Sequence, residues 1–218
     1  MPVDFRTVTI EVAINAVQAY NSGSYRGFKN LHLDRCARHV FHAGLAPTLE
    51  GILEQVRFIG KDYGGVAGFQ AALSLAPAIA HEIYAVRDRY ESLVQAAPPL
   101  SCSPSSDKVV AELYAPFVKL AHDKRNWQVW AAKFWHFLNP DAFPIEDSRV
   151  DTFLGLAGRA NSVQKYVGFL HRFREFAMAH QSWLPLLRKA DGGYSWCENK
   201  LWDKVCYGVV ELKNVRTS

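Results

Sequence analysis

Hydrophobic residues recur along most of the chain at steps of three and four, the spacing that places side chains on one face of a helix. Between residues 7 and 20 they include Val8, Val12 and Val17, and the sequence Asn21-Ser22-Gly23 then ends the pattern. Alternation of apolar and polar residues, which is typical of strands, is nearly absent. The pattern therefore predicts an all-α protein.

Capping and breaking residues give approximate bounds for the other helices. Pro47 and Thr48 stand where a helix begins and Gly60 where it ends, the usual asymmetry of these residues. Asn139-Pro140 stops a dense apolar helix, and Asn161 or Ser162 starts a long one. The predicted helices span residues 7–20, 33–42, 48–60, 66–75, 77–96, 107–122, 127–138, a short stretch after 147, 162–180 and 197–212.

The clearest linker is APPLSCSPSSD at residues 97–107, with three Pro, four Ser and almost no periodicity. It predicts two packed helical lobes, residues 1–97 and 108–218, joined by a linker at 98–107. With 218 residues, 49% of them hydrophobic, the chain is long enough for such a core. Its 13 Phe, 9 Tyr and 6 Trp are expected mainly to fill gaps between helices.

The chain reads as a protein of the cell interior. Its N-terminus carries acidic residues and no uninterrupted apolar stretch, unlike a signal peptide. The longest apolar run, residues 66–80, is interrupted by Gln70 and Ser74 and is too short to span a bilayer. We therefore expect a cytoplasmic protein that does not enter the membrane.

Charge and cysteine spacing restrict the chemistry. A net charge of +4 permits an anionic partner such as nucleic acid but does not require one. The four cysteines form no CxxC pair, so free thiols are expected rather than disulfides or a zinc site. His39 and His42 lack companion ligands, and the chain has no phosphate loop and no nucleotide-binding glycine cluster. We expect neither a metal nor a cofactor.

The most informative segment is AAKFWHFLNPDAFPIEDSRVDTFL at residues 131–154. A helix runs into the extended turn Phe143-Pro144-Ile145, and Asp147 then stands at the start of another helix. A carboxylate there accepts hydrogen bonds from free backbone N–H groups, and this capping role explains an Asp by itself. The same geometry, in a cleft between lobes, would also let a carboxylate stabilise a cationic sugar or orient water.

This segment resembles the catalytic region of the helix-hairpin-helix/Gly-Pro-Asp (HhH-GPD) DNA glycosylases. It is more similar to a divergent bacterial branch, which has Lys-x-x-His-Phe followed by Asn-Pro-x-x-Phe-Pro-Ile-x-Asp-Ser-x-Val. The close match covers about 25 residues, and the later Leu201-Trp202 and Gly208 give weaker support. The matching residues are Lys133, His136, Phe137, Asn139, Pro140, Phe143, Pro144, Ile145, Asp147, Ser148 and Val150.

The resemblance implies DNA binding and base excision with Asp147 as the catalytic carboxylate. Two departures shape that expectation. The glycine-rich turn that grips phosphate in the family is replaced here by His122-Asp123-Lys124-Arg125-Asn126. The nucleophilic lysine of bifunctional members would fall at Gln128 or Val129, so the resemblance implies a monofunctional N-glycosylase that uses water.

The other candidate site residues surround Asp147. Lys133 is the second candidate catalytic residue; it is either a surface lysine extending from an apolar helix or a buried partner of Asp147 or Glu146. For His136 and for Trp127, Trp130 and Trp135 the helical spacing favours core packing over contact with a flipped base. The candidate nucleic-acid contacts are Lys124, Arg125, Arg149, Trp127 and His136, with Arg159 also flanking the motif.

Two alternatives remain open at this stage. The chain could be a non-catalytic helical interaction protein in which Asp147 and Lys133 only hold the turn. Arg174 and His180 also fit the loose Arg-x4–6-His pattern of helical ribonucleases of the HEPN type, a spacing that arises often by chance. A dimer that brings two copies of His180 together would favour that reading.

Overall fold

The computed structural model describes residues 7–22, 27–63, 69–118, 127–160 and 162–216. Secondary structure in these ranges is entirely helical, which confirms the all-α prediction. A π-helical stretch, Phe58–Asp62, continues α3, and a short 3-10 turn, Gln181–Trp183, precedes α10. The α-helices are α1 Ile10–Ser22, α2 Gly27–Val40, α3 Leu49–Arg57, α4 Phe69–Ala85, α5 Arg87–Ala96, α6 Asp107–Val118, α7 Trp127–Leu138, α8 Ser148–Phe153, α9 Val163–Ala179, α10 Leu184–Asp191 and α11 Glu198–Arg216.

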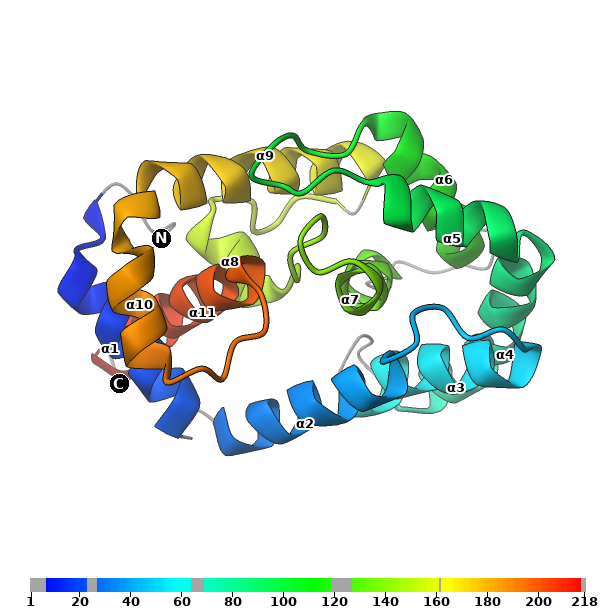
Figure 1. Ribbon diagram of the computed structural model, residues 1–218, viewed down its shortest axis with the longest axis horizontal. Helices are drawn as coiled ribbons and strands as arrows, with labels where there is room; N and C mark the ends of the chain where they lie inside the picture. The colour runs from blue at the N-terminus through cyan, green and yellow to red at the C-terminus, as the bar shows by residue number, and fades with distance from the viewer. Residues whose placement is uncertain (1–6, 23–26, 64–68, 119–126, 161, 217–218) are drawn as a thin grey trace.

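Helix α7 lies at the centre of the molecule, with α2 to α6 and α9 around it (Figure 1). Its described side chains, residues 128–138, are all buried, as expected for a helix that is apolar on every side. Trp130 and Trp135 are 0% exposed, and their indole N–H groups donate to Val56 O at 3.0 Å and Tyr90 Oη at 2.7 Å. These two tryptophans therefore pack in the core, and neither forms a stacking surface for bases.

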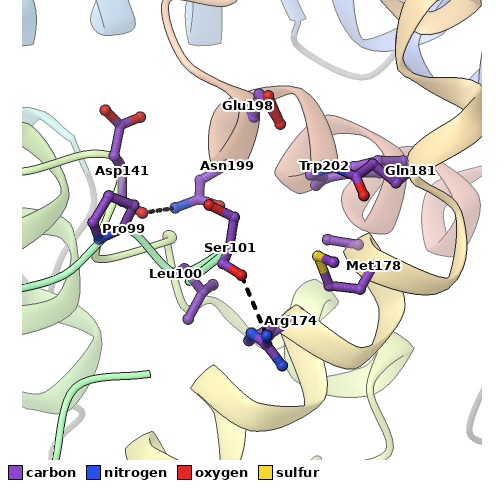
Figure 2. A pocket seen from close by; sticks show the side chains of 11 residues that line it. Pro99, Leu100, Ser101, Asp141, Arg174, Met178, Gln181, Glu198, Asn199 and Trp202 are labelled. Atoms are coloured by element: carbon purple, nitrogen blue, oxygen red, sulfur yellow. Dashed lines mark hydrogen bonds between the residues drawn. The ribbon is translucent and has the colours of Figure 1, made fainter. Parts of the chain in front are cut away.

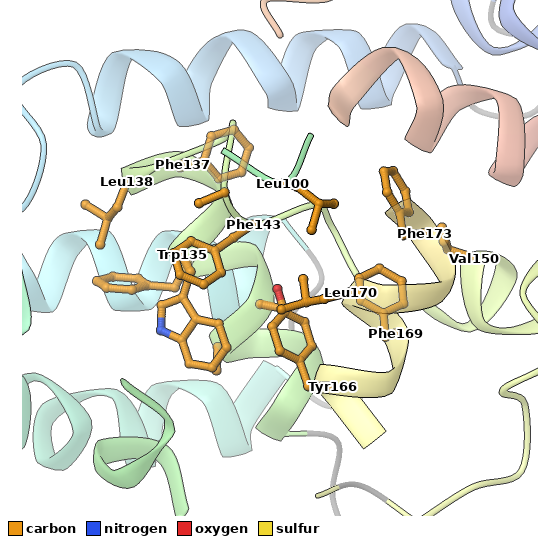
Figure 3. Packing of buried hydrophobic residues seen from close by; sticks show 14 of the residues in the cluster. Leu100, Trp135, Phe137, Leu138, Phe143, Val150, Tyr166, Phe169, Leu170 and Phe173 are labelled. Carbon is orange, nitrogen blue, oxygen red and sulfur yellow. The ribbon is translucent and has the colours of Figure 1, made fainter. Parts of the chain in front are cut away.

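The core is rich in aromatic rings at the junction of α7 and α9 (Figure 3). Trp135 meets Tyr166 edge to face at 5.2 Å between ring centroids and lies 5.7 Å from Phe143. Residues 142–146 of the turn after α7 therefore lie in the core, whereas Asp141 is exposed. Because Phe143 and Ile145 are almost completely buried, the backbone entering Asp147 is held firmly on both sides.

Helix α1 packs against α10 and α11, so the first helix lies beside the last two. The contact is close at Gly208, where an added Cβ would lie 2.6 Å from Ala16 O and 2.7 Å from Ala16 Cβ. Buried residues from before and after the predicted linker form one hydrophobic cluster, and Leu100 of that linker is itself 2% exposed. The two predicted lobes therefore share one core. Their division at 98–107 stays a prediction.

Local signals predicted several helix ends correctly. The bounds of α7 agree with the expectation, and Thr48, Asp147 and Ser162 each cap a helix with a side-chain oxygen. Two expectations were wrong: α4 continues through Pro77, which was expected to begin a helix, and Gly60 lies within the π-helical stretch. Helix α10 and the described portion of α2 before residue 33 were not predicted.

The described residues also bear on two further expectations, that the chain does not enter a membrane and that its cysteines are free. No helix there is both long and apolar enough to cross a bilayer. All four cysteines are free thiols, as their spacing predicted.

Candidate functional site

Asp147 caps the N-terminus of α8. Its backbone is extended, with φ −145° and ψ 173°, and its Oδ1 accepts the N–H groups of Arg149 at 2.8 Å and Val150 at 3.1 Å. The residue is partly exposed, and Oδ2 makes no hydrogen bond to a described residue. The cap contributes about 1 kcal/mol of stability, and it leaves one carboxylate oxygen for a ligand.

Lys133 lies inside the protein beside Asp147, so the surface interpretation of this lysine was wrong. It is 8% exposed, its Nζ donates to Tyr63 O at 3.3 Å, and the same ammonium lies 5.4 Å from the centroid of the Tyr63 ring. Burial lowers the pKa of Lys133, while the negative charge of Asp147 opposes that shift. The charge of Asp147 therefore favours the protonated form of Lys133.

Glu146, the other partner expected for Lys133, belongs to a different buried network. Gln128 Nε2 donates to both of its carboxylate oxygens, at 2.8 and 2.6 Å, and Lys165 Nζ lies 2.8 Å from Oε1. Lys165 also pairs with Asp151 at 2.6 Å. Burial, together with repulsion from Asp151, raises the pKa of Glu146 to about 7. This network ties α7 to α9 and holds the residue immediately before Asp147.

A second buried ionic cluster, which sequence patterns did not reveal, is centred on Lys200 of α11. Its Nζ lies 2.9 Å from Asp203 Oδ2, 3.4 Å from Asp34 Oδ1 and 3.2 Å from Tyr20 Oη. Tyr63 Oη donates to Asp34, which links this cluster to the tyrosine that contacts Lys133. Burial alone would lower the pKa of Lys200, but the nearby carboxylates more than offset it and raise the pKa.

Three buried acceptor atoms of this region have no hydrogen-bond partner among the described residues: Asp34 Oδ2, Asp203 Oδ1 and His136 Nε2. The ring of His136 has its Nδ1 2.7 Å from Phe143 O, so Nδ1 donates and Nε2 accepts. Burial lowers the pKa of His136 to about 3, which keeps the ring neutral. All three atoms are completely buried, and each has acceptor capacity that no described residue uses.

The basic and aromatic candidates differ in accessibility. His136 is 0% exposed, which corrects the expectation that it contacts nucleic acid and agrees with the packing alternative. Arg149 is on the surface, but its Nε pairs with Glu211 Oε1 at 2.6 Å, and its guanidinium lies 5.2 Å from the Tyr207 ring centroid. Arg159 is exposed. Lys124, Arg125 and the side chain of Trp127 lie outside the described residues.

Arg174 and His180, the pair of the ribonuclease alternative, both have packing roles. Arg174 Nη2 donates to Ser101 O at 3.2 Å, beside a pocket of about 260 Å³ (Figure 2). His180 is 9% exposed, its Nδ1 lies 2.9 Å from Phe176 O, and its ring centroid is 4.0 Å from that of Trp183. These contacts favour structural roles, and the ribonuclease reading stays an untested prediction.

The sequence contains a signal for the Lys200 cluster, although hydrophobic periodicity alone does not detect it. Lys200 and Asp203 are three positions apart on α11, so they share a helix face with Lys204, which is also buried. Their partner Asp34 is far away in the chain. Charged residues on an otherwise buried helix face could have been recognised, but their partner could not.

The chain was compared with protein-family models, curated proteins and solved structures, and none of the three comparisons gives a match. A relation to the HhH-GPD proteins therefore rests on the residues of the 131–154 segment and their weaker C-terminal companions.

Proposed function

We propose that this chain binds DNA and acts as a monofunctional N-glycosylase of the HhH-GPD type, with Asp147 as the catalytic carboxylate. The observation that supports it most is the position of Asp147. The side chain lies at a helix N-terminus, is partly exposed and commits only Oδ1 to the cap among the described residues. Negative charge is favoured there by the amide dipoles at the start of α8.

The chemistry follows from that placement. When the glycosidic bond of a nucleotide breaks, positive charge develops on the sugar, and a fixed carboxylate stabilises it. The base departs with the bonding electron pair as this bond breaks, water adds to the sugar carbon, and the proton that the water loses balances the proton that the departing base takes up from solvent. Gln128 and Val129 occupy the positions at which the resemblance would require a lysine nucleophile, so no covalent enzyme intermediate is proposed.

Lys133 acts as a positioning residue in this proposal. Its buried ammonium is held by Tyr63 O and is attracted by the Asp147 carboxylate.

The test measures base release from a panel of duplexes, each carrying one damaged or modified base. Asp147→Asn is the decisive variant because Asn caps a helix about as well as Asp, so the fold is retained while the charge is lost. Asp141→Asn, an exposed position in the same segment, is the matched control. We expect the wild type and Asp141→Asn to release a base and Asp147→Asn to lose that activity.

A non-catalytic interaction protein is the second candidate, because two cap hydrogen bonds account for Asp147 without any reaction. It predicts no base release from any duplex and unchanged partner binding in Asp147→Asn. Absence of both base release and salt-sensitive DNA binding would reject the glycosylase proposal.

A further inference from the structure

Side chains of α2 and of the segment Tyr194–Trp196 line a groove. This segment connects α10 to α11 (Figure 1). It contains two adjoining hollows of about 460 and 200 Å³, which share Arg35, Arg38 and Trp196 in their walls. The larger hollow is of a size suited to an organic ligand. Its walls are formed by Arg35, Arg38, His39, Phe41, His42, Phe137, Pro140 and Trp196.

The larger hollow is basic. Two arginines and two histidines line it together with aromatic and proline side chains, and no carboxylate is among its lining residues. The smaller hollow reaches Asp34, which is 2% exposed and paired with Lys200 and Tyr63. An anion would therefore be repelled from the floor of the smaller hollow and attracted to the arginines between the two.

The two arginines are held in a way that leaves their charge available. The guanidinium of Arg38 lies 5.6 Å from the Trp196 ring centroid, and that of Arg35 lies 6.0 Å from the Tyr194 ring centroid. In the described part of the chain neither forms an ion pair, whereas Arg149 pairs with Glu211. A guanidinium placed over a ring keeps its N–H edge free for the bidentate hydrogen bonds that phosphate accepts.

We propose that this groove binds the phosphodiester backbone of a DNA strand, with Arg35 and Arg38 contacting phosphates. The proposal rests on DNA being the partner, as proposed above, and assigns a phosphate-binding surface outside the 122–126 turn. Basic groups interleaved with aromatic rings suit a strand of nucleic acid, because the charges follow the backbone and the rings offer apolar contact to sugars and bases. The volume exceeds the needs of an isolated phosphate and accommodates a nucleotide unit.

The experiment measures binding of undamaged single-stranded and duplex oligodeoxynucleotides across a salt titration. Arg35→Gln/Arg38→Gln removes both proposed phosphate contacts, and we expect the slope of log K against log salt to fall by about 2. Lys108→Gln/Arg172→Gln removes the same charge from exposed positions on α6 and α9, away from the groove (Figure 1), and should leave the slope nearly unchanged. Arg35→Lys/Arg38→Lys keeps the charge and should retain most of the slope. Circular dichroism of each variant verifies the fold.

Each outcome separates this inference from the glycosylase proposal. An unchanged slope in Arg35→Gln/Arg38→Gln, or an equal fall in the Lys108→Gln/Arg172→Gln control, overturns the groove even when Asp147-dependent base release is found. A fall confined to the groove variant supports the groove even when no duplex releases a base. Absence of oligonucleotide binding by the wild type overturns the groove, and absence of base release as well would reject both proposals.

Discussion

Two buried lysines of α11 each pair with an aspartate, Lys204 with Asp191 at the end of α10 and Lys200 with Asp203 of α11 itself, and the two carboxylates are satisfied very differently. Asp191 accepts Lys204 Nζ at 2.6 Å, Asn21 Nδ2 at 3.1 Å and Ser195 N at 2.6 Å, so both of its oxygens are engaged. Asp203 accepts Lys200 at 2.9 Å through Oδ2, while its Oδ1 has no described partner. The same two residue types therefore form a completed pair between α10 and α11 and an incomplete cluster around Lys200 of α11.

The pKa shifts of the two aspartates have opposite directions. Burial alone would raise the pKa of Asp191, but its hydrogen bonds and the charge of Lys204 outweigh burial and lower it. Burial dominates at Asp203 and raises its pKa to about 6. The difference indicates that the Asp191 pair stabilises the fold, whereas the carboxylate of Asp203 is incompletely satisfied and its charged form is disfavoured by burial.

The largest expected effect follows from breaking the completed pair. Asp191→Asn leaves Lys204 buried without its counter-charge and should cost about 3–5 kcal/mol at pH 7. Asp191→Asn/Lys204→Met, which removes both charges, should recover much of that loss. Urea unfolding measures both variants, and a loss in Asp203→Asn as large as that in Asp191→Asn would contradict the comparison.

The second effect concerns pH. Because the folded-state pKa of Asp203 is raised, folding binds a proton between about pH 4 and 6, and the contribution of this group to stability falls as pH rises through that window. Asp203→Asn should therefore gain stability relative to the wild type over the same window, by up to about 3 kcal/mol. The contribution of Asp191 is lost in the opposite direction, as pH falls below about 4. Unfolding curves of the wild type and Asp203→Asn at several pH values test this. A stability difference between them that does not change with pH would contradict the distinction drawn between Asp203 and Asp191.

Substitution of Gly208 tests whether the close approach of α1 and α11 is needed to bring α1 side chains to Lys200 and Lys204. Tyr20 and Asn21 reach Lys200 and Lys204 only because α1 and α11 approach closely at this glycine. Gly208→Ala should cost about 1–3 kcal/mol through overpacking. Gly168→Ala in α9, where an added Cβ meets nothing within 4 Å, is the control and should gain up to about 1 kcal/mol. Equal effects of the two substitutions, measured by thermal unfolding, would show that the close approach is not needed.

The smallest effect separates capping from chemistry at Asp147. Asp147→Ala should cost about 1 kcal/mol, and Asp147→Asn much less, because Asn also accepts the two amide hydrogen bonds. Thermal unfolding of both variants checks this. A large loss in Asp147→Asn would mean that the charge itself holds the fold, as it does for Asp191.

Sequence reasoning succeeded where structure depends on neighbours in the chain. The caps at Asp147 and Ser162 and the bounds of α7 follow from local hydrogen bonding and helix-breaking residues. It failed at Pro77, where the surrounding α4 continues. Pairing across the chain was also out of reach, because the contact between Lys200 and Asp34 depends on how whole helices pack.

The candidate site was predicted in the same uneven way. The motif located Asp147 and its neighbour Lys133, but it did not reveal that Glu146 pairs with Lys165. It likewise gave no indication of the groove formed by Arg35, Arg38 and Trp196, since α2 and the segment before α11 are far apart in the chain. Polar networks and surfaces of this kind become visible only once the helices are packed.

The most direct measurement is single-turnover base release by Asp147→Asn, with its fold verified by unfolding in the same buffer. We expect a folded protein that binds the duplex as the wild type does and no longer frees the base. Wild-type rates of release in that variant would contradict the central role given to the Asp147 carboxylate.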